Sequence, residues 1–218
     1  HNSKVIVFGI GGVGSFVVEA LTRAGVGNLI LVDNDTICIS NINRQIHARQ
    51  STVGMIKVEA MKERVISINP NCNVEAKQVF ITAENISEII PSDVDYVVDA
   101  IDTVTSKLAL AEYCYKNNIN IISSMGTGNK IDPTQFRVSD VFKTKVCPLA
   151  KVMRYELRKR GVKELKVVYS EEMPMTPDKG RAVPSQKRQT PGSISFVPPV
   201  AGMIIGGEVI KDLTGLNK

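Results

Sequence analysis

The chain has 218 residues, of which 43% are hydrophobic and 22% charged, which is typical of a soluble protein with one α/β domain. No apolar run reaches the roughly 20 residues that cross a bilayer, and the sequence lacks the charged and then apolar order of a secretory signal. These features argue against a membrane protein or a secreted protein. The net charge of +5 mildly favours a polyanionic partner.

The four cysteines are scattered along the chain and form no C-x-x-C pair: Cys38, Cys72, Cys114 and Cys147. Structural zinc sites usually take their ligands from closely spaced pairs, so we expect no zinc. Because nothing indicates secretion, we expect reduced thiols and a cytoplasmic protein.

The first predicted elements form a β-turn-α-β unit. Residues 4–8 are a short apolar run, typical of a strand buried on both faces. The turn Gly9-Ile10-Gly11-Gly12-Val13-Gly14 follows, then a helix over 15–24 and a second strand over 28–32. Glycines Gly9, Gly11, Gly12 and Gly14 permit a tight turn and a close approach of backbone N–H groups to phosphate, so this unit predicts a nucleotide site.

The next elements continue the alternation, and the character of the chain changes after residue 133. We predict helices over 57–69, 86–90 and 105–117 and strands over 73–79, 96–98 and 120–124. This order predicts a Rossmann-like, doubly wound α/β fold with a mostly parallel sheet. A C-terminal extension over 134–218 adds strands at 136–141 and 166–169, a basic helix at 149–160, a mobile loop at 174–192 and a closing helix at 200–213. We expect residues 1–218 to form a single domain with its nucleotide-binding core in 1–133.

Two acids follow the second strand. Asp33 stands about 20 residues after the glycine turn, where a carboxylate accepts hydrogen bonds from ribose hydroxyls. Asp35 lies two residues further on. The alternative is that both acids only shape a turn.

Arg44, Lys57 and Asp102 distinguish this sequence from a plain dinucleotide fold. A guanidinium binds non-bridging phosphate oxygens in a bidentate manner, and an ammonium neutralises a leaving pyrophosphate. Asp102 follows the strand at 96–98, where a carboxylate is suited to hold Mg²⁺ on phosphates. Alternatively, Arg44 and Lys57 are solvated surface residues and Asp102 caps a helix. The three together beside a nucleotide fold favour an enzyme that splits ATP.

These motifs resemble the ubiquitin-activating-type adenylyltransferases, which include the enzymes that charge sulfur-carrier proteins. The resemblance implies an ATP site with Mg²⁺, attack of a carboxylate on the α-phosphate, and an acyl-adenylate. It also implies that Asp33 binds ribose, that Asn43, Arg44 and Lys57 hold phosphates, and that Asp102 lies near the metal. It is carried by Gly9-x-Gly11-Gly12-x-Gly14, Asp33-x-Asp35, Ser40-Asn41-x-Asn43-Arg44-Gln45, Lys57 and Asp99-x-x-Asp102, so Asp35 and Asn41 are included among the nucleotide-binding residues.

The second half of the chain is similar to the tRNA threonylcarbamoyladenosine dehydratases. The family implies that ATP activates the threonine carboxylate of threonylcarbamoyladenosine in tRNA, and that the neighbouring carbamoyl group closes onto it with net loss of water. The intramolecular step is fast through proximity and needs no enzyme nucleophile. The similarity is carried by Gly126-Thr127-Gly128-Asn129-Lys130-Ile131-Asp132-Pro133-Thr134, Lys143-Thr144, Cys147-Pro148-Leu149, Arg154-x-x-Leu157-Arg158, Val167-Val168-Tyr169-Ser170-x-Glu172 and 191–198.

The resemblance also implies partners. A tRNA substrate gives the basic side chains a role, although a charge run is more often a solvated helix face. The superfamily implies a homodimer, in which an arginine of the neighbour's N-terminal segment reaches ATP, and sulfur-transfer proteins are further candidate partners. No arginine of that kind is present in this sequence. The candidate tRNA-binding residues are Lys151, Arg154, Arg158, Arg160, Lys187 and Arg188.

Two other functions remain open. An adenylyltransferase for a carrier protein ending in Gly-Gly shares the ATP motifs, but its usual zinc pairs are absent. A non-catalytic nucleotide-binding module would leave Arg44, Lys57 and Asp102 without a role. Cys147 and His47 are better interpreted as a loop thiol and a packing residue than as catalytic groups.

Overall fold

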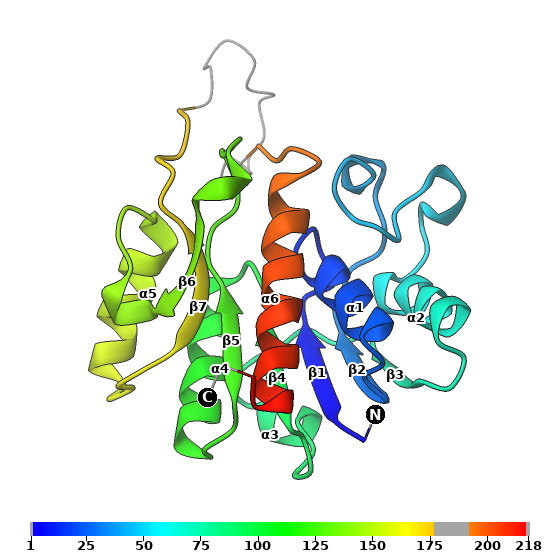
Figure 1. The fold of residues 1–218 in the computed structure, drawn as a ribbon, viewed down its shortest axis with the longest axis horizontal. Coiled ribbons are helices and arrows are strands. Elements are labelled where there is room, and N and C mark those ends of the chain that lie inside the picture. Colours follow the sequence, from blue (N-terminus) through cyan, green and yellow to red (C-terminus); the bar gives the residue numbers. More distant parts are fainter. Residues whose placement is uncertain (1, 177–191, 217–218) are drawn as a thin grey trace.

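The computed structural model describes residues 2–176 and 192–216. In this part of the chain seven strands form one sheet in the order β3-β2-β1-β4-β5-β7-β6 (Figure 1). Neighbouring strands pair in parallel except β6, which is antiparallel to β7. The predicted doubly wound, mostly parallel α/β fold is therefore confirmed. The strand order reverses between β1 and β4, and this type of sheet binds ligands at the carboxyl ends of the strands beside such a point.

The first half of the chain forms the units β1 (Lys4–Phe8), α1 (Gly14–Arg23), β2 (Asn28–Val32), α2 (Lys57–Ile68) and β3 (Asn73–Lys77). In β1 and β2 all residues except the first are buried. Both strands lie inside the sheet with helices on both faces, which is why they consist of continuous apolar runs.

The chain then crosses to the other side of β1. Here α3 (Ile86–Ile89), β4 (Tyr96–Asp99), α4 (Val104–Lys116) and β5 (Ile121–Ser124) follow one another. Strand β4 pairs with β1 from Val5↔Tyr96 to Phe8↔Asp99. Asp99 therefore lies level with the last residue of β1, at the carboxyl edge of the sheet.

The last third adds β6 (Phe136–Asp140), α5 (Pro148–Lys159), β7 (Lys166–Ser170) and α6 (Val197–Thr214) to the same sheet. Short 3-10 turns precede and follow β6, at Pro133–Gln135 and Val141–Lys143. The hairpin-like pairing of β6 with β7 was not predicted, because the sequence fixes the strands but not their relative direction.

Helices cover both faces of the sheet (Figure 1). Apolar side chains of α1, α2 and α6 pack on one face, and those of α3 and α4 on the other. A third cluster joins α4, α5 and β7. Among the described helices, none combines the length and apolar character that spanning a bilayer requires.

Helix α6 begins at Val197, three residues earlier than predicted. Pro198 and Pro199 were interpreted as part of a preceding loop, but both lie in the first turn of the helix. A proline fits there because the first helical N–H groups have no partner within the helix. The helix then packs closely on α1, since a Cβ on Gly202 would lie 2.4 Å from the carbonyl oxygen of Val13.

The long connection between β2 and α2 has a structure of its own. It contains two 3-10 turns, Ile39–Asn41 and Gln50–Thr52. An isolated antiparallel bridge joins Thr36 to Ile56, so its two ends lie side by side. This closure brings the start of α2 back to the carboxyl end of β2.

Candidate active site

The glycine turn connects β1 to α1, and two of its glycines are required by the fold. Gly9 has a φ of +84°, and a Cβ on it would lie 2.6 Å from the carbonyl oxygen of Ala100. A Cβ on Gly14 would lie 1.8 Å from the carbonyl oxygen of Gly9. Both spaces are too small for any side chain.

The other two predicted glycines lie against different neighbours. A Cβ on Gly11 would meet only the amide nitrogen of Gln45, at 3.9 Å. A Cβ on Gly12 would be squeezed between Arg44 and Pro198, at 3.2 and 3.1 Å. The N-cap of α1, Val13, provides no side-chain hydrogen bond to the helix end. The N–H groups of Ser15, Phe16 and Val17 donate to the carbonyl oxygens of Gly11 and Val13, so the N–H groups suited to an anion such as phosphate are those of the glycine turn before them.

Asp33 follows β2 directly and is hydrogen-bonded to the glycine turn. One carboxylate oxygen accepts from the N–H of Ile10 at 2.6 Å, and the other accepts from the N–H of Asp35 at 2.9 Å. Burial raises the pKa of the Asp33 carboxyl, while Lys57 opposes that shift. The acid that was predicted to bind ribose thus also fixes the position of the glycine turn.

Lys57 is the first residue of α2 and its side chain is 7% exposed. Its Nζ lies 2.7 Å from Asp35 Oδ2 and 3.9 Å from Asp33 Oδ1. The carboxylate of Asp35 is 58% exposed, so water and a ligand can reach this ion pair. An incoming phosphate can therefore share the ammonium with Asp35.

Arg44 and its neighbours form a connected group beside the glycine turn. The Nη1 of Arg44 donates to the carbonyl oxygen of Ser40 and to Asn43 Oδ1, both at 2.9 Å. The Nδ2 of Asn43 donates to the carbonyl oxygen of Ser193 at 2.9 Å. Asn41 instead accepts from the N–H of Cys38 at 2.9 Å and closes a 3-10 turn. Asn41 and Asn43 thus shape the segment that holds Arg44.

Asp102 is exposed at the next strand end, between β4 and α4. Its carboxylate accepts a long hydrogen bond of 3.4 Å from the hydroxyl of Thr103. Residues 2–176 and 192–216 contain no group of three or more His, Cys, Asp or Glu that could hold a metal ion. Mg²⁺ is often held by one or two carboxylates together with phosphate oxygens and water. A single exposed carboxylate fits that manner of binding.

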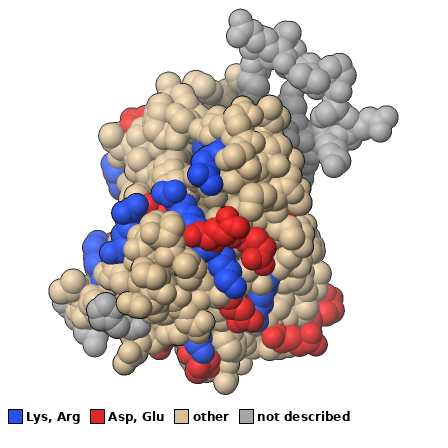
Figure 2. Space-filling view, turned by 90° about the vertical axis from the view of Figure 1, so that its right-hand side faces the viewer, with Lys and Arg blue, Asp and Glu red and all other residues tan. Residues whose placement is uncertain are grey.

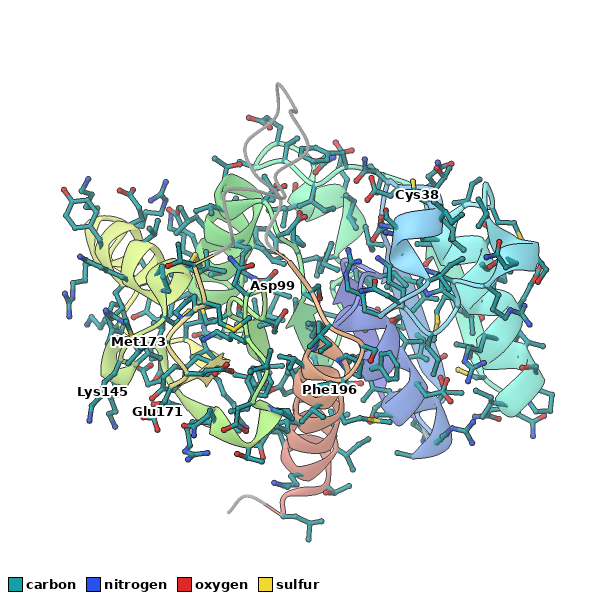
Figure 3. The ribbon with its side chains drawn as sticks, turned by 90° about the horizontal axis from the view of Figure 1, so that it is seen from above. Cys38, Asp99, Lys145, Glu171, Met173 and Phe196 are labelled. Carbon is teal, nitrogen blue, oxygen red and sulfur yellow. The ribbon has the colours of Figure 1, made fainter. Side chains whose placement is uncertain are left out.

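The strand ends bring these residues to one edge of the sheet, and Figure 3 looks onto that edge. Cys38, beside the Arg44 segment, lies towards one end of the view, and Asp99 lies near its middle. Lys145, Glu171 and Met173 lie towards the other end, in the part formed by the C-terminal extension. The predicted nucleotide residues follow β1, β2 and β4, which are neighbours in the sheet, whereas α5, the helix of the predicted tRNA residues, packs with α4 and β7.

Two polar side chains of the segment after Arg44 are buried, namely Gln45 of the predicted motif and His47, which was interpreted as a packing residue. Gln45 Oε1 and both ring nitrogens of His47 have no hydrogen-bond partner among the described residues. Burial, with smaller effects from Lys57 and Arg64, lowers the pKa of His47 to about 4. The spacing of these two residues in the sequence did not indicate that their polar atoms would be buried without hydrogen-bond partners.

The predicted tRNA residues on α5 differ in what they already contact. Arg154 donates to Thr144, Arg158 lies 5.2 Å from the centre of the Phe142 ring, and Arg160 pairs with Glu156 and Glu112. Lys151 is exposed. Cys147 is buried at the N-cap of α5. Lys187, Arg188 and most of the predicted mobile loop lie outside the described residues.

Comparison with known proteins identifies relatives over the length of the chain. The ThiF family matches residues 1–218. The tRNA threonylcarbamoyladenosine dehydratase of Bacillus subtilis is 47% identical over 221 residues, which cover 97% of this chain and 87% of that protein. The dehydratase of Escherichia coli is 45% identical over 157 residues, which cover 72% of this chain and 59% of that protein.

The fold agrees with solved structures of the same kind. The structure of the E. coli tRNA N6-threonylcarbamoyladenosine dehydratase TcdA in complex with ATP has a TM-score of 0.88 and 36% sequence identity, and the match covers 99% of this chain and 87% of that one. TcdA has also been solved in complex with AMP. The chain therefore belongs to the ThiF family and, within it, to the tRNA threonylcarbamoyladenosine dehydratases.

Proposed function

We propose that this chain uses ATP to activate the threonine carboxylate of threonylcarbamoyladenosine in tRNA, and that the activated group then cyclises. The observation that carries this proposal is the 47% identity to a dehydratase over 97% of the chain. The site supports it, because phosphate-binding and ribose-binding groups gather at one sheet edge. ATP as the nucleotide is supported by the ATP complex of TcdA.

The position of each side chain supports the nucleotide-binding role that we propose for it. Asp33 accepts hydrogen bonds from the ribose, and the N–H groups of the glycine turn face the phosphates. Arg44 and Lys57 bind phosphate oxygens, and Asn43 orients Arg44. Asp102 would hold Mg²⁺, which would supply positive charge to offset the charge that develops on the leaving pyrophosphate.

The chemistry has two steps, which balance without a further reactant. A carboxylate oxygen of the threonine attacks the α-phosphorus of ATP, and pyrophosphate leaves. The carbamoyl group of the same nucleoside then attacks the activated carbonyl carbon and AMP leaves, so the nucleoside loses one water in total. The second step is intramolecular, which removes the need for an enzyme nucleophile. The burial of Cys147 supports leaving it out of this scheme.

A tRNA partner is expected to meet the extension side of the molecule, where Lys151, Arg154, Arg158 and Arg160 lie on or next to α5. The α2 side carries acids beside a band of Lys and Arg, as Figure 2 shows. Two arginines of that side, Arg23 and Arg64, are paired with Glu19. A mixed surface attracts a polyanion less than a basic one does. A tRNA substrate also supports the predicted cytoplasmic location.

A second copy of the chain and a sulfur-transfer protein are the other partners that we propose. We expect a homodimer, which light scattering on the purified chain measures directly. A sulfur-transfer protein would have to meet Cys38, because the other three cysteines are buried. Modification of Cys38 by an alkylating reagent would then block sulfur transfer while leaving dehydration unchanged.

Mass spectrometry of nucleosides tests the proposed reaction. tRNA that carries threonylcarbamoyladenosine is incubated with the protein, ATP and Mg²⁺. We expect a nucleoside lighter by one water, absent without ATP and reduced by at least about a hundredfold in rate for Arg44→Ala. An unchanged nucleoside, with pyrophosphate exchange only after addition of a carrier protein ending in Gly-Gly, would instead support a carrier adenylyltransferase.

A further inference from the structure

A fully buried ion pair lies beneath the turn that carries Asp102. Asp99, the last residue of β4, and Lys107, in the first turns of α4, are both 0% exposed, and the Nζ of Lys107 lies 2.9 Å from Asp99 Oδ2. The hydroxyl of Ser123 on β5 donates to the same oxygen at 2.5 Å. Figure 3 shows Asp99 near the middle of the carboxyl edge.

Both charged groups also bind the backbone of Ile101. Its N–H donates to Asp99 Oδ1 at 3.1 Å, and its carbonyl oxygen accepts from the Nζ of Lys107 at 3.1 Å. The peptide groups on both sides of Ile101 are therefore fixed by hydrogen bonds to the buried ion pair. The next residue is Asp102.

The same turn is also held from the side by β1. The N–H of Ala100 donates to the carbonyl oxygen of Phe8 at 2.8 Å. Gly9 lies so close that a Cβ on it would be 3.0 Å from the nitrogen of Ile101. The turn that carries Asp102 and the glycine turn are thus in direct contact.

Stability alone does not account for this ion pair. Lysine is almost never fully buried unless it is paired. Taking two charges out of water is costly, and an apolar pair of similar volume is often equally stable or more stable. An apolar pair, however, cannot bind both the N–H and the carbonyl oxygen of Ile101. The distinctive effect of Asp99 and Lys107 is therefore the fixed geometry of this turn.

We propose that Asp99 and Lys107 are positioning residues for Asp102. They hold the turn so that the Asp102 carboxylate faces the phosphates of ATP and the accompanying Mg²⁺. This inference rests on the role proposed above for Asp102.

Binding of ATP by the full chain without tRNA provides the first test. Titration calorimetry compares Lys107→Met with wild type, with and without Mg²⁺, after circular dichroism has established that the variant is folded. We expect roughly a tenfold loss of affinity for ATP with Mg²⁺, and less than a twofold change for ATP without metal. Arg64→Met, which removes a partner of the buried Glu19 far from Asp102, is the matched control and leaves both affinities unchanged. Equal affinities for wild type and Lys107→Met would overturn the proposal.

A double-mutant comparison separates positioning from a general structural effect. If Lys107 acts through Asp102, then Asp102→Asn with Lys107→Met loses no more affinity than Asp102→Asn alone. Losses that multiply would reject the proposal. Should Lys107→Met fail to fold, Ser123→Ala removes one hydrogen bond to Asp99 and gives a smaller loss of the same kind.

Different results would reject the dehydratase function and the positioning role of Asp99 and Lys107. A wild type that binds ATP with Mg²⁺ through Asp102 but leaves the tRNA nucleoside unchanged would reject the dehydratase function and keep the positioning role. Affinity that is the same in wild type and Asp102→Asn would reject the role of Asp102 and, with it, the positioning proposal.

Discussion

A lysine–aspartate ion pair lies near the end of β2 and another near the end of β4, and the two differ in their exposure to water. At β2, Lys57 meets Asp35, whose carboxylate is 58% exposed. At β4, Lys107 meets Asp99, and both side chains are 0% exposed. In an ion pair that water reaches, a ligand can replace one partner. A fully buried ion pair is closed to ligands and can only fix the position of the protein groups around it. The burial of the carboxylate therefore separates the pair that we propose to bind a ligand from the pair that we propose to position Asp102.

Removing Lys107 is expected to have the largest effect on stability. Lys107→Met leaves the buried Asp99 carboxylate without its cation, which should lower the free energy of unfolding by about 3–5 kcal/mol. Urea denaturation measures the change. Arg64→Met should cost much less, because Glu19 keeps Arg23 as a partner. Equal losses in the two variants would remove the distinction between the fully buried pair and the others.

The buried His47 should make the unfolding free energy of the protein depend on pH. Its pKa is lowered from 6.5 to about 4 by burial, so the unfolded chain binds the proton more tightly than the folded one. The contribution of His47 is thus fully present above pH 6.5 and is lost as the pH falls towards 4, by up to about 3 kcal/mol. His47→Gln should flatten the difference in unfolding free energy between pH 7 and pH 4. An unchanged slope in this variant would assign the pH dependence to the carboxylates.

Lys57→Met should cost less stability than Lys107→Met but more ATP affinity. Asp35 can be hydrated when Lys57 is removed, but the buried Asp33 carboxylate also loses the nearby ammonium, so the unfolding free energy should fall by about 1–3 kcal/mol. The affinity of the variant for ATP should fall roughly tenfold to a hundredfold, since a charged hydrogen bond to phosphate is lost. Thermal unfolding and calorimetry on the same samples measure both. A large loss of stability with ATP affinity retained would contradict the comparison.

The smallest expected effect is on tRNA binding by α5 and the residue after it. Here we compare an exposed lysine with an arginine that is already in ion pairs. Lys151→Ala should weaken tRNA binding by about 1 kcal/mol and lower its salt dependence, as one phosphate contact is lost. Arg160→Ala should change it less, because Arg160 is paired with Glu156 and Glu112. Filter binding at several salt concentrations compares them. A stronger effect of Arg160 would mean that its ion pairs open on RNA.

The sequence predicted the fold well where local pattern decides the structure. Strands β1 and β2 agree with the predicted residues because a doubly covered parallel strand is a continuous apolar run. The start of α6 was misplaced because proline ends a helix in its interior but suits its first turn. The direction of β6 depends on pairing across the sheet, which a local pattern does not contain.

For the site, the sequence indicated residue types but not their contacts. The chain order of Arg44, Lys57 and Asp102 beside a nucleotide fold led to the prediction of phosphate-binding and metal-binding groups, which stays a prediction. The pairing of Lys57 with Asp35 depends on the bridge between Thr36 and Ile56, which no spacing rule anticipates. Lys107 reads as an ordinary lysine of an amphipathic helix, and only the packing of α4 on the sheet makes it a buried cation.

The contact of Gly12 with Pro198 has a consequence for how the protein is made. Chains grow from the N-terminus at about 5–20 residues per second, so the glycine turn leaves the ribosome long before α6 does. Until α6 arrives, the apolar residues of α1 lack the part of their packing that α6 provides, and the turn lacks its neighbour Pro198. A growing chain should therefore gain the ability to retain ATP only after α6 has been synthesised.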